Sequence, residues 1–99
     1  MFAAAAVSLL ATGTALAEDA SALAQESGCL ACHAVQFKVV GPAYKDVATK
    51  YKGQDDALDK LVAKVKAGGS GVWGEVPMPP NVYVSDENIK TIVQWVLSL

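Results

Sequence analysis

The sequence predicts an all-α protein with four helices. Two observations support this prediction. Four segments repeat apolar residues at helical spacing, and no segment of useful length alternates apolar and polar residues as a half-buried strand does. The chain has 99 residues, which is enough for one small domain. We therefore expect a single helical domain.

The first two predicted helices cover residues 19–27 and 42–51. The first is rich in alanine and ends before Gly28, a residue suited to the position after a helix. The second begins with Pro42, which suits the first helical position. Its expected core face is Tyr44, Val47, Ala48 and Tyr51.

The other two predicted helices cover residues 56–67 and 86–98. The third begins at an Asp-Asp pair able to cap it and ends before two glycines, and the fourth follows Ser85 as N-cap. Irregular stretches remain at 29–41 and 68–84, and a loop as long as the second is usually functional. The expected core faces are Leu58, Leu61, Val62 and Val65 in the third helix and Ile89, Ile92, Val93, Val96 and Leu97 in the fourth.

Residues 1–17 form a separate apolar segment, with 13 apolar side chains and no charged one. The segment ends in the small-x-small pattern Ala15-Leu16-Ala17, which is typical of a secretory signal peptide cleaved after Ala17. The alternative is an uncleaved membrane anchor, although a span needs about 20 apolar residues. We expect residues 18–99 to be a periplasmic domain without stable membrane insertion.

The composition of the remaining domain is that of an ordinary soluble protein. The apolar fraction of 53% for the whole chain falls to about 48% without the first 17 residues, near the globular average. The net charge is −2 and all eight basic residues are lysines, so nucleic acid is not expected as a partner. We expect a monomer.

The motif Cys29-x-x-Cys32-His33 is the attachment signal of a c-type haem. Each thiol can add to one haem vinyl group, and the adjacent histidine can supply an axial nitrogen. Three alternatives exist. A thioredoxin-like dithiol needs a βαβ pattern, a structural zinc site needs four ligands, and a local disulfide would leave His33 without a role.

Met78 is the candidate for the second axial ligand. If the iron is six-coordinate through common side-chain ligands, Met78 is the remaining choice besides His33 once Met1 leaves with the signal peptide. It lies in Val76-Pro77-Met78-Pro79-Pro80-Asn81, where three prolines restrict the backbone. The alternative is that Met78 only fills a gap in the packing.

The remaining candidates each have a simpler structural role as an alternative. The carbonyl of Gly41 or Pro42 could accept the second ring N–H of His33, or the pair could only start a helix. Trp73 could donate its indole N–H to a haem propionate, or pack in the core. Lys64 could neutralise a propionate, or lie on a solvated helix face. Trp95 is most simply a core residue where the last helix crosses the first.

Taken together, the motifs resemble the short bacterial class I cytochromes c of the c-551/c-552 type. The resemblance covers residues 18–99 and is carried by segments 28–33, 40–48, 71–74, 77–81 and 95–98. It implies the four-helix class I cytochrome c fold, wrapped around one covalent haem.

The resemblance also implies roles for the site residues. It assigns two thioether links, two axial ligands and three supporting contacts. These are Cys29 and Cys32 for the thioethers, His33 and Met78 for the iron, the Pro42 carbonyl for the His33 ring, Trp73 for a propionate and Asn81 for the Met78 sulfur. Such proteins often have arginine at the position of Lys64, and lysine makes only a point-charge contact there.

The expected function is a one-electron shuttle between periplasmic redox proteins, not an enzyme. A set of lysines could steer a partner of opposite charge, or only form a solvated face: Lys38, Lys45, Lys50 and Lys52. One alternative is a haem enzyme or gas-binding module in which Met78 is incidental. The other is a thiol–disulfide oxidoreductase, which would be colourless.

Overall fold

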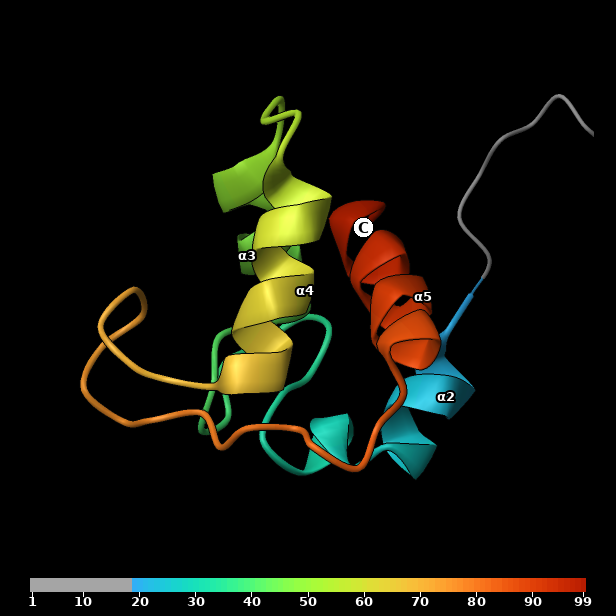
Figure 1. The fold of residues 1–99 in the computed structure, drawn as a ribbon. Helices are drawn as coiled ribbons and strands as arrows, with labels where there is room; N and C mark the ends of the chain where they lie inside the picture. The colour runs from blue at the N-terminus through green and yellow to red at the C-terminus, as the bar shows by residue number, and fades with distance from the viewer. Residues whose placement is uncertain (1–18) are drawn as a thin grey trace, which may run out of the picture.

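The computed structural model describes residues 19–99, which contain four α-helices and one short 3-10 helix (Figure 1). The elements are α2 (Ser21–Glu26), η1 (Cys29–Ala31), α3 (Tyr44–Tyr51), α4 (Ala57–Ala67) and α5 (Asp86–Leu97). Within residues 19–99 there is no β-strand, which confirms the all-α prediction. The signal peptide predicted for residues 1–17 lies outside the described residues. None of the described helices is long and apolar enough to cross a membrane.

Helix α5 is the centre of the packing and contacts α2, α3 and α4 (Figure 1). Trp95 on α5 is 6% exposed, and its ring meets the Tyr44 ring edge-on with 5.7 Å between centroids. The prediction that Trp95 is a core residue is therefore confirmed. The other members of the core cluster are Ala20, Ala24, Val47, Tyr51, Ala57, Ile92 and Val96.

Helix α3 begins two residues later than predicted, so Pro42 is not its first residue. Ala43 is the N-cap and has an extended backbone with ψ 141°. The first amides of the helix donate to the preceding loop, Tyr44 N to Ala34 O at 2.9 Å and Lys45 N to Val35 O at 3.0 Å. These bonds satisfy helix-end donors that have no partner inside the helix. They also leave the Pro42 carbonyl outside the helix, available to another donor.

The start of α5 agrees with the sequence prediction, and the start of α4 differs from it. Ser85 Oγ accepts a hydrogen bond from Asn88 N at 3.1 Å, so the predicted N-cap is confirmed. Asp56 precedes α4, but its side chain makes no capping hydrogen bond. Its backbone, with φ −93° and ψ 6°, is not in the extended conformation that aims a capping side chain. The carboxylate instead lies 3.7 Å from Lys60 Nζ.

Two glycines end helices as predicted. Gly28 follows α2 by two residues with φ +85°, and Gly68 follows α4 with φ +71°, a region in which glycine carries no Cβ penalty. The irregular stretch 68–84 leaves the end of α4, projects to one side and returns beneath the helices to α5 (Figure 1). This course places the loop next to the other irregular stretch.

Candidate functional site

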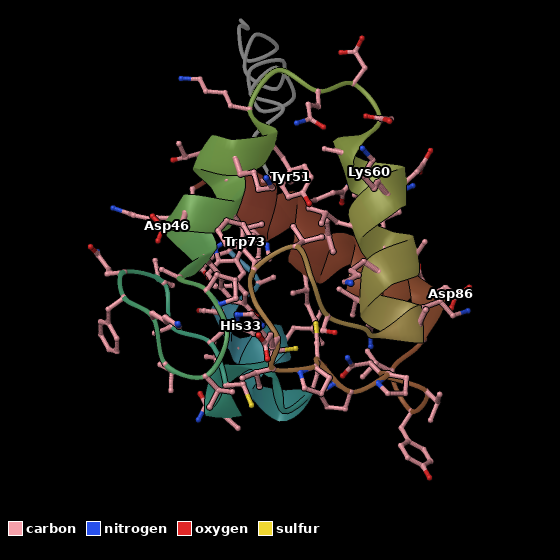
Figure 2. The ribbon with its side chains drawn as sticks, turned by 90° about the vertical axis from the view of Figure 1, so that its left-hand side faces the viewer. His33, Asp46, Tyr51, Lys60, Trp73 and Asp86 are labelled. Atoms are coloured by element: carbon pink, nitrogen blue, oxygen red, sulfur yellow. The ribbon has the colours of Figure 1, made fainter. Side chains whose placement is uncertain are left out.

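A cavity of about 260 Å³ opens between the two irregular stretches and helices α3, α4 and α5. His33 and Trp73, which both line it, appear between α3 and α4 in Figure 2. Most of the lining is apolar. The helices contribute Val47, Tyr51, Leu61, Val65, Ile89, Ile92, Val93 and Val96. Leu61 and Val65, expected on the core face of α4, therefore face this cavity.

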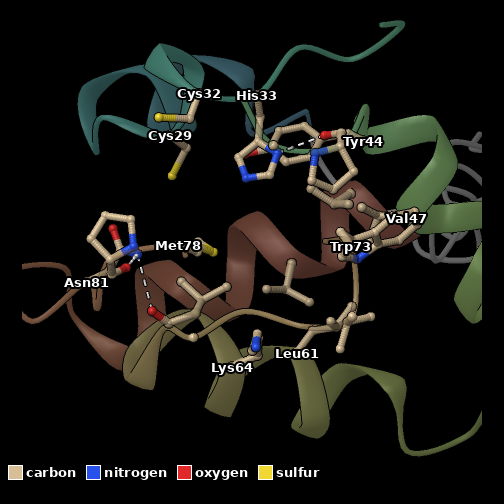
Figure 3. Close-up of a pocket in the computed structure, with 18 of the residues that line it drawn as sticks. Cys29, Cys32, His33, Tyr44, Val47, Leu61, Lys64, Trp73, Met78 and Asn81 are labelled. Atoms are coloured by element: carbon tan, nitrogen blue, oxygen red, sulfur yellow. Dashed lines mark hydrogen bonds between the residues drawn. The ribbon is translucent and has the colours of Figure 1, made fainter. Parts of the chain in front are cut away.

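Cys29 and Cys32 lie along one edge of the cavity, next to His33 (Figure 3). The left-handed backbone of Gly28 turns the chain from α2 into η1, which begins at Cys29. Both thiols are free and half-buried, so they do not form a local disulfide. Among residues 19–99, no group of three Cys, His, Asp or Glu side chains is placed to hold a metal ion.

The backbone that precedes α3 accepts a hydrogen bond from the His33 ring and so orients it. Its Nδ1 donates to the Pro42 carbonyl at 2.8 Å, so Pro42, rather than Gly41, supplies the acceptor. The ring stacks on Tyr44 with 4.8 Å between centroids and 20° between planes. With Nδ1 engaged, Nε2 is the free nitrogen, and Figure 3 shows it on the cavity side of the ring. A carbonyl partner fixes both the tautomer and the orientation of a ligating histidine.

Gly41 is needed because the His33 ring lies against its backbone. A Cβ on residue 41 would lie 2.5 Å from His33 Cε1 and 2.9 Å from Nδ1. Real Cβ atoms do not approach other atoms this closely, so a side chain at residue 41 requires the ring to move. Gly41 therefore contributes space for the ring, a role that the sequence pattern Gly-Pro did not indicate.

Burial raises the pKa values of one thiol and one hydroxyl group that line the cavity near His33. Burial raises the pKa of the Cys29 thiol, and the Tyr44 hydroxyl beside it lowers that pKa only in part. The pKa of Tyr44 is raised well above its usual value, first by burial and then by the Cys29 charge. Both groups therefore stay protonated at neutral pH.

Met78 lies on the side of the cavity opposite the cysteines and His33 (Figure 3). Its backbone pairs with Gly69 at the end of α4. Gly69 N donates to Met78 O and Met78 N donates to Gly69 O, each at 2.9 Å. The half-buried Met78 side chain is thus attached to α4 through its own peptide groups.

Asn81 does not make the contact that the resemblance implied. Its Nδ2 donates to the carbonyls of Val65 and Pro79, each at 3.2 Å, and no hydrogen bond joins it to the Met78 sulfur in the described structure. The backbone N–H of Asn81 also donates to Val65 O at 3.2 Å. The amide protons therefore fasten the loop to α4 and are not directed at the sulfur.

Trp73 lies at the end of the cavity away from the cysteines, with Lys50 next to its ring. In Figure 3 the Trp73 ring and the cysteines are at opposite ends, and Lys64 also lines the cavity. Trp73 is 42% exposed, so it is a rim residue and not a core one. Lys50 Nζ lies 5.7 Å from the centroid of its ring and 5.9 Å from that of Tyr51. The sequence placed Lys50 only among surface lysines and gave no sign of this contact.

The arrangement fits a haem c. Two free thiols lie beside a histidine whose outer nitrogen faces an apolar cavity, and a thioether lies across it. These are the attachment and axial groups that a c-type haem requires.

Comparison with known proteins agrees with this fit. Residues 17–99 match the family model described as cytochrome c. The chain is 61% identical over 77 residues to cytochrome c-551 of Allochromatium vinosum, covering 78% of this chain and 82% of that protein. It is 53% identical over 95 residues to cytochrome c-552 of Nitrosomonas europaea, covering 96% of this chain and 90% of that protein.

The fold is also similar to that of solved structures. The crystal structure of wild-type Nitrosomonas europaea cytochrome c552 aligns with a TM-score of 0.78 and 56% identity, covering 82% of this chain and 99% of that one. Sequence and structure therefore agree on the family and on the fold. The chain belongs to the cytochrome c family, as a small class I electron-transfer cytochrome of the c-551/c-552 type.

Proposed function

We propose that this chain holds one haem c, covalently attached through Cys29 and Cys32, and carries single electrons between periplasmic redox proteins. His33 and Met78 are the proposed axial ligands. The observation that carries the proposal is their placement on opposite sides of one apolar cavity, with both thiols along its edge. Periplasmic location rests on the signal peptide predicted for residues 1–17.

The His33 side supports the proposal because the ring is already oriented for ligation. The hydrogen bond from Nδ1 to the Pro42 carbonyl keeps that nitrogen protonated, so the lone pair lies on Nε2. Tyr44 supports one face of the ring, and Gly41 leaves room for it. A ligand held in this way loses little conformational freedom when it binds iron.

The position of Met78 in the cavity favours an electron carrier over an enzyme. If His33 and Met78 occupy both axial positions, no coordination site remains for a substrate. A thioether ligand also favours the reduced iron and raises the potential. The two hydrogen bonds with Gly69 hold the Met78 backbone beside α4, which helps a weak ligand compete with water.

The apolar lining sets the electrostatic environment of the site. When bound, haem supplies a one-electron couple at its iron. Val65, Ile92 and Val93 exclude water from the cavity wall and keep the local dielectric low. Trp73, at the end of the cavity away from the cysteines, and Lys64, which also lines the cavity, are the proposed partners of the haem propionates.

Transient electron donors and acceptors are the proposed partners. Contacts of this kind bury little surface, below about 1,200 Å². Lys38, Lys45 and Lys52 are exposed and available for steering an acidic partner. Lys50 differs from them because its ammonium lies over two aromatic rings. We expect it to contribute less to steering than the other three.

Intact mass measured after denaturation tests the attachment. A mass increase of one haem that survives unfolding is expected if Cys29 and Cys32 form thioethers. Cys29→Ser and Cys32→Ser should each leave a single thioether. An unmodified mass for a colourless wild-type protein would contradict the proposal and favour thiol–disulfide chemistry.

The Met78→Ala variant tests the axial ligand. We expect a lower reduction potential and rapid binding of carbon monoxide to the reduced variant, because the sixth position opens. Val82→Ala, at an exposed position of the same loop, is the matched control and should change neither property. Rapid and complete carbon monoxide binding by the wild-type protein would favour a gas-binding or enzymatic role.

A further inference from the structure

The loop that carries Met78 is closed at its base by a short backbone neck. The neck consists of the reciprocal hydrogen bonds between Gly69 and Met78, each 2.9 Å long. Asn81 N, which donates to Val65 O at 3.2 Å, fastens the next part of the loop to α4. Residues 70–77 therefore form a lobe that leaves α4 and returns to it at Met78.

Gly68 lies directly under this neck, in contact with the backbone that follows Met78. A Cβ at residue 68 would collide with the Met78 carbonyl oxygen and would lie 2.8 Å from Pro80 N and 2.9 Å from the Pro79 carbonyl carbon. All three are main-chain atoms, so no rotamer change relieves the collision. Prolines restrict the backbone of this segment further. A side chain at residue 68 must therefore push the segment away from α4, and Met78 with it.

The neighbouring glycines show that this restriction is local. A Cβ at Gly69 would meet only the end of the flexible Lys64 side chain, Nζ at 3.0 Å and Cε at 4.0 Å. A Cβ at Gly71 would have no atom within 4 Å. Both residues have positive φ, +129° and +109°, as Gly68 does with +71°. The three positions thus share an unfavourable backbone for other residues, and only at Gly68 would an added Cβ meet the Met78 main chain.

We propose that Gly68 is a positioning residue for Met78. Its lack of a side chain lets the Met78–Pro80 segment lie against the end of α4, and this approach sets how far the thioether reaches into the cavity. The inference rests on the proposed function, in which Met78 is an axial ligand. Gly68 itself does not touch the cofactor and acts only through the backbone.

The first test compares Gly68→Ala with Gly53→Ala as holoproteins. Gly53 is the matched control because its φ is +82°, a Cβ there would have no atom within 4 Å, and it does not line the cavity. Both variants should lose thermal stability because of the positive φ. Gly68→Ala alone should show a lower reduction potential, a weakened methionine-to-iron absorption band and carbon monoxide binding at least tenfold faster than wild type. Wild-type potential and carbon monoxide binding in Gly68→Ala would overturn the inference, and so would the same changes in Gly53→Ala.

The second test uses the wild-type protein and does not depend on a variant that folds. Imidazole is added to the oxidised holoprotein to displace Met78, and amide hydrogen exchange is followed. We expect the Gly69 and Met78 amides to exchange at least tenfold faster, and the Ile92 amide in α5 to keep its protection. Unchanged exchange at the neck would overturn the inference. Failure of the proposed function is seen separately, as an unchanged potential in Met78→Ala.

Discussion

The Gly41→Ala variant isolates the fit between the backbone and the His33 ring. Gly41 is not among the glycines with positive φ, so alanine introduces no backbone strain. The added Cβ would lie 2.5 Å from His33 Cε1, 2.9 Å from Nδ1 and 3.0 Å from Nε2. Since non-bonded carbon atoms prefer about 3.5 Å or more, the ring must retreat by about 1 Å.

This displacement acts on the hydrogen bond that orients the ring. His33 Nδ1 is 2.8 Å from the carbonyl of Pro42, the residue next to Gly41, so a shift of this size lengthens or misaligns the bond. Loss of the bond costs about 1 kcal/mol, and the added methyl group costs about 1–3 kcal/mol as overpacking. We expect the free energy of unfolding of the holoprotein to fall by about 2–4 kcal/mol.

Guanidinium unfolding measures the stability of the variant. The reduction potential of the holoprotein and the NMR resonances of His33 report the position of the His33 ring. The control is Gly74→Ala, which introduces strain at φ +123° with no atom within 4 Å of the new Cβ. It should lower stability without moving the His33 signals. A Gly41→Ala protein within about 0.5 kcal/mol of wild type, with unchanged His33 resonances, would refute the argument.

Three further predictions concern the surface. Lys50→Gln should lower the free energy of unfolding by about 0.5–1 kcal/mol, because its ammonium lies over two aromatic rings, while Lys52→Gln should not. Ser85→Ala should cost about 1 kcal/mol in chemical denaturation, because it removes the cap of α5. The hydrogen bond from Ser21 N to Asp19 holds the pKa of that carboxyl below its usual value. The small contribution of this bond to the free energy of unfolding should be fully present above the usual pKa of an aspartate. It should be lost as pH falls through the lowered pKa of Asp19, which an NMR titration of Asp19 checks.

The sequence predicted best what depends on local spacing. The stripe on α5, its Ser85 cap and the glycine stops after α2 and α4 all agree with the structure. These features follow from neighbours within one or two helical turns, which a single sequence contains. The C-x-x-C-H pattern is local in the same way, and its two cysteines and histidine all line the cavity.

Features that depend on distant segments were predicted less well. Asn81 donates to Val65, sixteen residues away, and nothing in the loop sequence indicated that acceptor. Pro42 seemed to start a helix, because the carbonyls of Ala34 and Val35 that cap α3 could not be identified beforehand. The glycine pair after α4 indicated a helix end correctly, but the same pair gave no sign that Met78 would lie against Gly68.

The hydrogen bonds between the loop 34–42 and its surroundings also bear on how the protein folds. Gly41 N bonds to Cys32 O at 2.7 Å and Tyr44 N to Ala34 O at 2.9 Å, so this wall joins residues only nine or ten apart. The side of the cavity that carries Met78 can form only after α4 has folded and the long loop has returned to it. Because short loops close at lower entropic cost, we expect the His33 wall to form earlier during folding. The two thiols would then be presented to haem while the opposite side is still open.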